Sequence, residues 1–451
     1  MTSSLYSLPK LKSPKAAAPA MDNLTRQLQS IEADIQAGRL SDAASMLNLI
    51  GKAYPRDARI YVSGWLLANK TDNVAAALQA AERAVALAPN SATAHYCLAD
   101  SRRRSGDIAA ARTSIETALM LTPENLAYRE LAVNLANLQA DHGVSERHLR
   151  AAFTQNPKIP GIKTMIGNAL RHQSKLDEAE KWLSEAVARN ADDADAHNGL
   201  AMVAYQRDDM EAARAHLAEA LRLQPGNQGY IYMNAVFSGQ TPEQPPEDMT
   251  RGLFDRYASR FDSHLVGALK YRVPQTFAAT ILRQFPDRKL NALDLGCGTG
   301  LLGAALGPIE GYFVGVDFSL PMLEEAKKHH VYSRLHNVNL LDALAATDAN
   351  EYEVIVAADV FIYLGALDAA IRDSFKVLKA GGWLHFSLET TDEDGPDFEV
   401  RKSMRYAHNP AYVRRLLDAA GFVSQSFEET DLRTEQDVPI RGMLVSAQKP
   451  A

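Results

Sequence analysis

The stretch ALDLGCGTGLLGAAL, residues 292–306, places glycines at positions 296, 298 and 300 directly behind a short apolar run. The run before the glycines is typical of a buried β-strand, and the apolar residues after them are typical of a helix. Glycine tolerates the backbone conformations that a tight loop requires. A glycine-rich loop between a strand and a helix predicts a ligand site at the edge of an open sheet.

The rest of the second half of the chain alternates in the same way between strand-like and helix-like stretches. Seven apolar stretches are typical of strands: residues 291–297, 312–318, 334–342, 352–360, 382–389, 422–429 and 442–449. Strands that alternate with helices predict a mostly parallel sheet with helices on both faces, an α/β Rossmann-like fold. Ligands of such folds bind beyond the carboxyl ends of the strands, where we expect the glycine loop.

Two classes of cofactor compete for this loop. A dinucleotide-binding loop needs a small residue where this sequence has Leu301. Asp294 stands two residues before the first glycine, and its carboxylate would repel a pyrophosphate but attract the ammonium group of an amino acid. S-adenosyl-L-methionine carries an ammonium group and a sulfonium cation and has no phosphate. The loop therefore favours S-adenosyl-L-methionine over a dinucleotide.

Further candidates for cofactor binding follow the next two strands. Asp317 ends the second strand, and its carboxylate can accept hydrogen bonds from both ribose hydroxyls. Phe318 can pack on the adenine ring, and Asp342, after the third strand, can accept a hydrogen bond from the adenine amino group. An aspartate at the end of a strand is often a helix N-cap. The conjunction of these residues after three consecutive strands nevertheless points to a cofactor site.

This order of motifs resembles the class I S-adenosylmethionine-dependent methyltransferases, over residues 253–451. The resemblance implies that the loop Gly296–Gly300 and Asp294 hold the methionine part, that Asp317 holds the ribose, and that Asp342 with Ala343 holds the adenine. It also implies that Ala358 and Asp359 lie beneath the sulfonium. The candidate cofactor-binding residues are Asp294, Gly296, Cys297, Gly298, Gly300, Asp317, Phe318, Asp342, Ala343, Ala358 and Asp359.

The first half of the chain follows a period of 34 residues, which is marked by prolines at 55, 89, 123, 157 and 225. Position 191, which would complete this series, carries alanine. Twelve residues before each of these six positions stand Ala43, Ala77, Ala111, Ser145, Ala179 and Ala213. Five residues before each stand Ile50, Ala84, Ala118, Ala152, Ala186 and Ala220. Seventeen before four of the marks stand the turn formers Gly38, Gly106, Ser174 and Asp208. Small residues at fixed phases predict two closely packed antiparallel helices per unit, and the proline closes the second helix.

This pattern resembles the tetratricopeptide repeat, with six units over residues 24–227 that would form an α superhelix. Such repeats usually present a groove to a protein or peptide partner, although the repeat does not name the partner. The basic run of Arg102, Arg103 and Arg104 fits a solvated turn between helices better than a docking site for an acidic partner. The whole chain is similar to bacterial predicted methyltransferases that carry tetratricopeptide repeats.

The remaining segments connect these two regions or precede them. Residues 1–23 lack the apolar core of a secretory signal and are expected to be a disordered leader. Residues 228–252 include SGQTPEQPPEDMTRG, and this content of proline and glycine predicts a semi-stiff linker. We therefore expect a leader, a repeat domain over residues 24–227, a linker and a methyltransferase domain over residues 253–451.

Candidates for acceptor-side catalysis are Tyr257, Glu389 and His408. Tyr257, with Phe261, belongs to helices that would cover the cofactor, as a lid does in related enzymes. Glu389 ends the fifth strand but could equally pair with an arginine, and His408 could equally cap the helix that follows it. A base is needed only if the acceptor arrives protonated, and no cluster of His, Asp or Glu with metal-ligand spacing accompanies these residues.

Composition limits the classes of function. The net charge of −7 argues against a general nucleic-acid binder. The two cysteines lie far apart and form neither a disulfide framework nor a zinc site. No apolar run is long enough to span a membrane, which favours a cytoplasmic location. We expect a methyltransferase whose repeats recruit a protein or a carrier-bound acceptor. The methyl acceptor and the oligomeric state stay open: the alternatives are a small-molecule carboxylate or metabolite as acceptor, with the repeats used for oligomerisation, or a non-catalytic scaffold whose second domain senses the cofactor.

Overall fold

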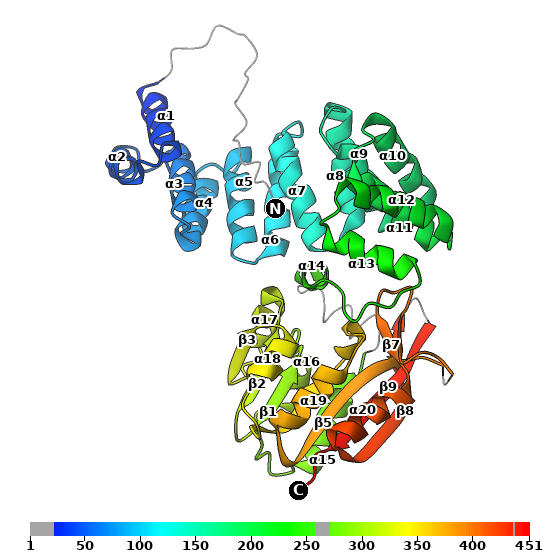
Figure 1. The fold of residues 1–451 in the computed structure, drawn as a ribbon. Helices are drawn as coiled ribbons and strands as arrows, with labels where there is room; N and C mark the ends of the chain where they lie inside the picture. The colour runs from blue at the N-terminus through cyan, green and yellow to red at the C-terminus, as the bar shows by residue number, and fades with distance from the viewer. Residues whose placement is uncertain (1–21, 258–270, 393, 436–437) are drawn as a thin grey trace. The chain divides into compact units, whose positions relative to one another are not determined.

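The computed structural model describes residues 22–257, 271–392, 394–435 and 438–451. Its chain separates into two units, residues 1–186 and residues 187–451, which are described one at a time below (Figure 1). Most of the predicted leader lies outside the described residues. The domain boundaries predicted from the sequence remain predictions, and the structure divides the chain elsewhere, within the fifth predicted repeat.

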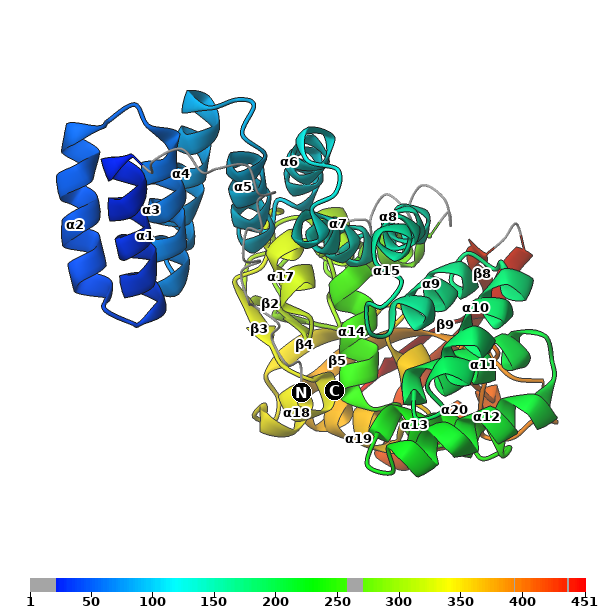
Figure 2. The same cartoon turned by 90° about the horizontal axis from the view of Figure 1, so that it is seen from above.

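The first unit consists of helices that follow one another in antiparallel pairs, and Figure 2 shows the first of these pairs from above. The helices are α1 (Asn23–Gln36), α2 (Leu40–Ala53), α3 (Ala58–Lys70), α4 (Val74–Leu87), α5 (Ala92–Arg104), α6 (Ile108–Leu121), α7 (Leu126–Leu138), α8 (His142–Gln155), α9 (Ile162–Arg171) and α10 (Leu176–Arg189), which runs three residues into the second unit. This succession confirms the helical repeats expected from the 34-residue period.

The small residues of the period lie where helices of a pair touch. Ala43, Ala77, Ala111 and Ala179 are fully buried, and Ser145 in the fourth unit is nearly so. The second set of small residues is buried as well, including Ile50, the one large member. A larger side chain at the fully buried positions would push the paired helices apart, because the interior is closely packed.

The turn inside each pair repeats with the same period and the same backbone conformation. In all six repeats the residue at this position of the turn has a positive φ: Gly38 (79°), Asp72 (53°), Gly106 (86°), Ala140 (49°), Ser174 (59°) and Asp208 (64°). Four of these turns were named from the sequence and two were missed, Asp72, which is a turn former like Asp208, and Ala140, which is not. Ala140 is the least favourable of the six, because its Cβ is strained in the left-handed region.

The second unit begins with three helices, α11 (Ala194–Gln206), α12 (Met210–Leu223) and α13 (Gln228–Phe237). Helix α13 corrects the prediction of a linker from residue 228, since Tyr230, Tyr232, Met233 and Phe237 bury their side chains against α11 and α12. The apolar content of this stretch, rather than the prolines that follow it, decides its structure. A further helix, α14 (Glu247–Tyr257), occupies the end of the predicted linker.

A nine-stranded sheet forms the rest of the second unit. Its path runs β3-β2-β1-β4-β5-β7-β6; β9 pairs with β5, and β8 pairs with β9. The strands are β1 (Ala292–Leu295), β2 (Phe313–Asp317), β3 (Arg334–Asn337), β4 (Tyr352–Ala357), β5 (Leu378–Thr390), β6 (Phe398–Val400), β7 (Tyr406–His408), β8 (Val423–Glu435) and β9 (Val438–Gln448). Strands β1 to β5 are parallel, as predicted; β8 and β9 contain the last two predicted strands and pair antiparallel with each other, whereas β6 and β7 were missed.

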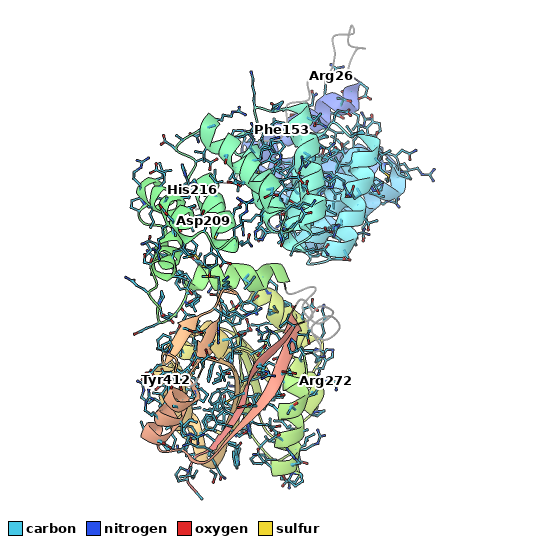
Figure 3. All side chains as sticks on the ribbon, turned by 90° about the vertical axis from the view of Figure 1, so that its right-hand side faces the viewer. Arg26, Phe153, Asp209, His216, Arg272 and Tyr412 are labelled. Atoms are coloured by element: carbon cyan, nitrogen blue, oxygen red, sulfur yellow. The ribbon has the colours of Figure 1, made fainter. Side chains whose placement is uncertain are left out.

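Helices cover both faces of this sheet. Helices α15 (Val273–Gln284) and α16 (Leu301–Leu306) pack on one face in a cluster around Phe277 and Phe313. Helices α18 (Leu340–Ala346), α19 (Asp368–Val377) and α20 (Pro410–Ala420) contribute to the cluster on the other face. Figure 3 shows Arg272, which precedes α15, and Tyr412 of α20 on opposite sides of the sheet. The remaining elements are α17 (Leu320–Lys327) and the short 3-10 helix η3 (Phe361–Tyr363). The observed order confirms the predicted α/β fold behind a helical repeat region.

Replacing Ala140 by glycine tests the strain in the turns of the first unit. Ala140→Gly should raise the free energy of unfolding by about 0.5–1 kcal/mol, because glycine removes the Cβ strain at positive φ. Ala80→Gly in the middle of α4 is the matched control and should lower it by about as much. Urea denaturation followed by circular dichroism measures both, and a loss of stability in Ala140→Gly would contradict the assignment.

Candidate functional site

The glycine loop follows β1 at the edge of the sheet where the strand order reverses, since β1 lies between β2 and β4. Gly296, Gly298 and Gly300 have φ values of 61°, 53° and 85°. A Cβ at Gly296 would lie 2.7 Å from Cγ2 of Val360, which belongs to the loop after β4. Gly296 is therefore required both by its backbone conformation and by the close approach of a neighbouring loop.

The carboxylate of Asp317 at the end of β2 joins this loop to the next one. Its Oδ2 accepts a hydrogen bond from the backbone N–H of Gly298 at 3.0 Å, and its Oδ1 accepts one from that of Ser319 at 2.8 Å. Asp317 is 8% exposed. Burial raises its pKa to about 6, although these backbone hydrogen bonds act in the opposite direction. Each carboxylate oxygen keeps a lone pair for a further donor.

Asp294 lies in β1 and is 2% exposed. Its Oδ2 accepts a hydrogen bond from the hydroxyl of Tyr332 at 2.7 Å, and burial raises its pKa to about 7. Tyr332 was missed by sequence reasoning. Two glycines make room for it, since a Cβ at Gly303 would lie 2.7 Å from its ring and a Cβ at Gly315 would lie 3.1 Å from it. In the sequence, Gly303 inside an apolar helix and Gly315 inside a buried strand indicate that a large side chain packs there.

Helix α14 lies against the loops that follow β2 and β4. The ring of Phe254 meets Phe318 edge-on at 5.9 Å between centroids and meets Tyr363 edge-on at 5.0 Å. The hydroxyl of Ser319 donates to Asp255 at 2.6 Å. These contacts hold α14 against both loops of the candidate site. Tyr257 ends α14, but its side chain and all of Phe261 lie outside the described residues.

The loop after β4 carries Ala358 and Asp359, and both are half-buried. Asp359 has a φ of 57°, and its backbone N–H donates to the hydroxyl of Ser387 at 2.8 Å. Its carboxylate forms an ion pair at 3.0 Å with Arg433 of β8. The same guanidinium binds Glu389 at the end of β5. Arg433 is 4% exposed, so it is a buried cation between two carboxylates.

These contacts change the interpretation of two catalytic candidates. Glu389 is held by the buried Arg433, the alternative that the sequence had left open. His408 is fully buried in β7, and its Nε2 lies 2.9 Å and 3.0 Å from the carbonyl oxygens of Leu364 and Gly365. Carbonyls only accept, so Nε2 carries the proton, and burial lowers the pKa of His408 to about 4. His408 thus binds the backbone carbonyls of residues 364 and 365, and the helix cap that the sequence offered as its alternative role is supplied by Asn409, which caps α20.

The remaining candidates lie around the same edge of the sheet. Asp342 is exposed in the first turn of α18, and Ala343 beside it is half-buried. Cys297 is buried inside the glycine loop, where burial raises the pKa of its thiol. Cys97 and Cys297 are both free. Within the described ranges, no group of three or more His, Cys, Asp or Glu side chains is placed to hold a metal ion.

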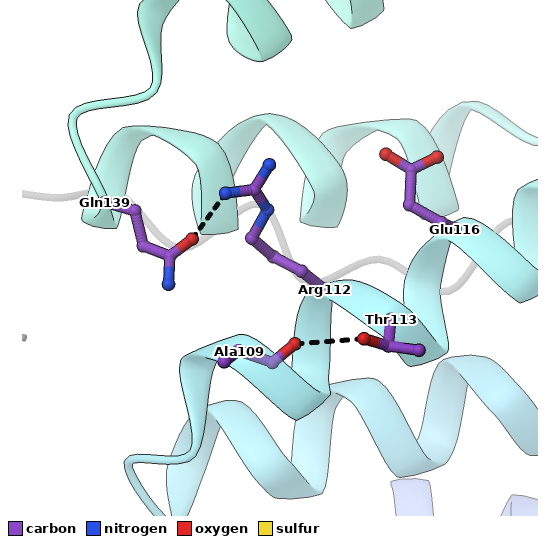
Figure 4. A pocket seen from close by; sticks show the side chains of 5 residues that line it. All are labelled: Ala109, Arg112, Thr113, Glu116 and Gln139. Carbon is purple, nitrogen blue, oxygen red and sulfur yellow. Dashed lines mark hydrogen bonds between the residues drawn. The ribbon is translucent and has the colours of Figure 1, made fainter.

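In the first unit, a hollow of about 350 Å³ is lined by Ala109, Arg112, Thr113, Glu116 and Gln139 (Figure 4). Arg112 is already occupied by Gln139 and Asp141, so the hollow offers a ligand little free charge. The three arginines of the predicted basic run also have partners inside the repeats: Arg102 with Ser114, Arg103 with Asp100, and Arg104 with Asn69 and Asp72. The three arginines lie in the last turn of α5 and are half-buried, so the prediction of a solvated turn between helices was wrong. None of the described helices is both long and apolar enough to cross a membrane.

Comparison with known proteins identifies both regions. Residues 293–384 match the family model of a methyltransferase domain. Residues 64–125, 139–191 and 164–228 match the model of the tetratricopeptide repeat. Among solved structures, the chain is similar to a tetratricopeptide-repeat protein described as having an unusual peptide-binding site (TM-score 0.39, 20% identity, covering 43% of this chain and 97% of that one). It is also similar to the magnesium protoporphyrin IX methyltransferase of Synechocystis with bound S-adenosylmethionine (TM-score 0.32, 17% identity, 44% and 83%).

Curated relatives fall into the same two groups. The chain is 26% identical over 152 residues to a ubiquinone biosynthesis O-methyltransferase of Paraburkholderia phytofirmans, covering 32% of this chain and 64% of that protein. It is 27% identical over 176 residues to a tetratricopeptide-repeat protein of Pseudomonas aeruginosa, covering 39% and 30%. The chain therefore spans less than two thirds of the length of these relatives. Taken with the fold and the site, these matches show that the chain joins tetratricopeptide repeats to a methyltransferase domain.

Proposed function

We propose that this protein is an S-adenosylmethionine-dependent methyltransferase. The observation that carries the proposal is the link between Gly298 and Asp317. Three glycines at positive φ bring a backbone N–H onto a carboxylate at the reversal point of a parallel sheet. This is the place where open α/β sheets bind ligands. It lies within residues 293–384, which match the methyltransferase domain.

The residues at this edge fit S-adenosylmethionine in charge and in hydrogen bonding. Asp317 has lone pairs left for the two ribose hydroxyls, and Phe318 offers a ring to the adenine. Asp294 and the glycine loop would hold the methionine part, Asp342 and Ala343 the adenine, and Ala358 and Asp359 would lie beneath the sulfonium. When bound, the cofactor supplies a methyl group that its sulfonium has already activated. The protein then has mainly to orient the acceptor's electron pair opposite the sulfur.

The acceptor side of the site is expected beside Asp359, Glu389 and Arg433. Arg433 holds both carboxylates in place at the ends of β4 and β5. Tyr271 is buried near this group, where burial, and secondarily the charge of Asp359, raises the pKa of its phenol. An amine or phenol acceptor must lose a proton, and Glu389 stays a candidate to accept it, although it is already paired with Arg433. Tyr257 stays a candidate for the cover of the site.

The repeats supply the second half of the proposal. Tetratricopeptide repeats commonly bind protein or peptide segments, and here they precede a transferase domain in the same chain. We infer that the first unit recruits a protein, or a carrier that presents the acceptor. Holding the acceptor near the site raises its effective concentration there without any new contact at the reacting atoms.

Titration with S-adenosylmethionine tests the cofactor site. Asp317→Ala should weaken binding about 10- to 100-fold, because it removes a charged acceptor and releases Gly298 and Ser319. Asp348→Ala, an exposed aspartate of the same unit, is the matched control and should bind like the wild type. Isothermal titration calorimetry measures both. Absence of binding in the wild type, or equal binding in the two variants, would refute the proposed cofactor site.

Loss of Arg433 tests the buried ion pairs. Arg433→Met leaves two buried carboxylates without their cation and should destabilise the second unit by roughly 3–5 kcal/mol. Arg441→Met, an exposed arginine on β9, should change it by less than about 0.5 kcal/mol. Hydrogen exchange of the β5 amides reports the local free energy of opening. Equal protection in both variants would show that Arg433 does not hold this edge together.

The acceptor is identified by incubating the protein with methyl-labelled S-adenosylmethionine and cell extract. We expect the label in the protein fraction with the wild type and none with Asp317→Ala. Label only in small molecules would favour a metabolite acceptor and overturn the recruiting role of the repeats. If S-adenosylmethionine binds but no label is transferred to any fraction, the scaffold alternative would replace the enzyme.

A further inference from the structure

Three segments of the second unit that are distant in sequence meet around the buried Tyr406 of β7. Its hydroxyl lies 2.8 Å from the carbonyl oxygen of Pro242 and 3.2 Å from the hydroxyl of Tyr232 in α13. A carbonyl can only accept, so Tyr406 donates to Pro242 and Tyr232 donates to Tyr406. The last helix of the repeat region is thus hydrogen-bonded to a strand of the sheet.

The residue after Pro242 binds the third segment. The carbonyl oxygen of Glu243 accepts hydrogen bonds from the backbone N–H groups of Gly365 at 2.7 Å and Ala366 at 3.3 Å. A Cβ at Gly365 would lie 2.7 Å from the rings of Phe398 and Tyr406 and 2.9 Å from the Glu243 oxygen. Glycine at 365 is therefore needed for this close approach.

His408 holds the same segment from the other side. Its Nε2–H donates to the carbonyl oxygens of Leu364 and Gly365, and the ring is fully buried. The amide groups of Gly365 and Ala366 are thus fixed by Glu243, and the preceding carbonyls are fixed by His408. Residues 364–366 have little freedom to move while both contacts persist.

This fixed segment is the end of the loop that follows β4. The loop begins at Ala358 and Asp359, continues through Val360 against the glycine loop, and passes Tyr363 against Phe254 of α14. A displacement at residue 365 would therefore reach the two places where the cofactor site is enclosed. Tight packing transmits such displacements instead of absorbing them.

The hairpin of β6 and β7 also rests directly on the last helices of the repeat region. Met404, in its turn, packs against the apolar cluster of α11, α12 and α13. Lys402 forms an ion pair with Asp208, the residue at positive φ between α11 and α12. The hairpin thus touches this helical group at its apolar cluster, at Tyr232 and at the turn.

We propose that Tyr232, Tyr406 and His408 are positioning residues that fix the loop at residues 358–366, and through it the cofactor site. The last repeat, α11 and α12, and the helix α13 that follows it are then a structural part of that site. The effect on cofactor affinity rests on the proposed function, whereas the fixing of the loop does not depend on it.

Tyr406→Phe tests this inference in the full chain, because it removes the hydroxyl and keeps the ring. Hydrogen exchange of residues 358–366 should become at least about fivefold faster, since the loss of one net hydrogen bond already corresponds to that factor and Tyr406→Phe removes two. The dissociation constant for S-adenosylhomocysteine should rise about threefold to tenfold. Tyr232→Phe removes only one of the two hydrogen bonds and should give a smaller change in the same direction, so it serves if Tyr406→Phe folds poorly.

Tyr230→Phe is the matched control. Tyr230 is a buried tyrosine of α13, the helix that also carries Tyr232, and its hydroxyl donates to Asp195 of α11 at 2.7 Å. This substitution should lower stability to a similar extent and leave residues 358–366 and ligand affinity unchanged. Equal exchange of residues 358–366 in the Tyr406→Phe and Tyr230→Phe proteins would overturn the inference. If the wild type binds no S-adenosylhomocysteine, the proposed function fails while the exchange comparison still decides the positioning role.

Discussion

The carboxylate of Asp317 is the constraint on which the site depends. It lies at the end of β2, yet it binds the backbone N–H of Gly298 in the loop after β1 and that of Ser319 before α17. Both loops would otherwise have backbone donors without partners at a buried edge, and such donors are costly. The glycines permit the turn, and Asp317 selects one conformation of it. A ligand at this edge meets a loop that is already shaped.

In the repeats, too, single residues fix the turns, because one residue at positive φ lies between the two helices of each pair. The left-handed residue recurs every 34 positions, and the fully buried small residue follows it five positions later. The repeat ends where α13 buries Tyr230, Tyr232 and Phe237. In the second unit the apolar surface of this helical group is covered by Met404 of the hairpin instead of another repeat. A terminal repeat needs such a cover, because each unit buries its apolar face only against a neighbour.

Much of the fold could be predicted from the sequence, because it depends on patterns that repeat or run along one segment. The repeat phases, the parallel strands and the glycine loop are of this kind. Strands β6 and β7 have three residues each, too short to show alternation. Tyr332 and Arg433 reach the site from distant parts of the chain, and no local pattern reports such contacts. Glu389 and His408 lie near strand ends as predicted, but no local pattern names Arg433 as the partner of Glu389 or the two backbone carbonyls that His408 binds.

The distribution of charge separates two sides of the site. Asp359 and Glu389 share the buried guanidinium of Arg433. Asp294 and Asp317 are bonded to neutral groups, a phenol and two amides, and the described residues contribute no ion pair to either. Two buried carboxylates without a cation are unfavourable when ionised, and burial accordingly raises the pKa of each. A cationic ligand would relieve this cost at Asp294, where the ammonium of S-adenosylmethionine is expected, whereas Asp317 is expected to bind the ribose hydroxyls. Asp359, whose charge Arg433 compensates, lies where the sulfonium and the acceptor are expected.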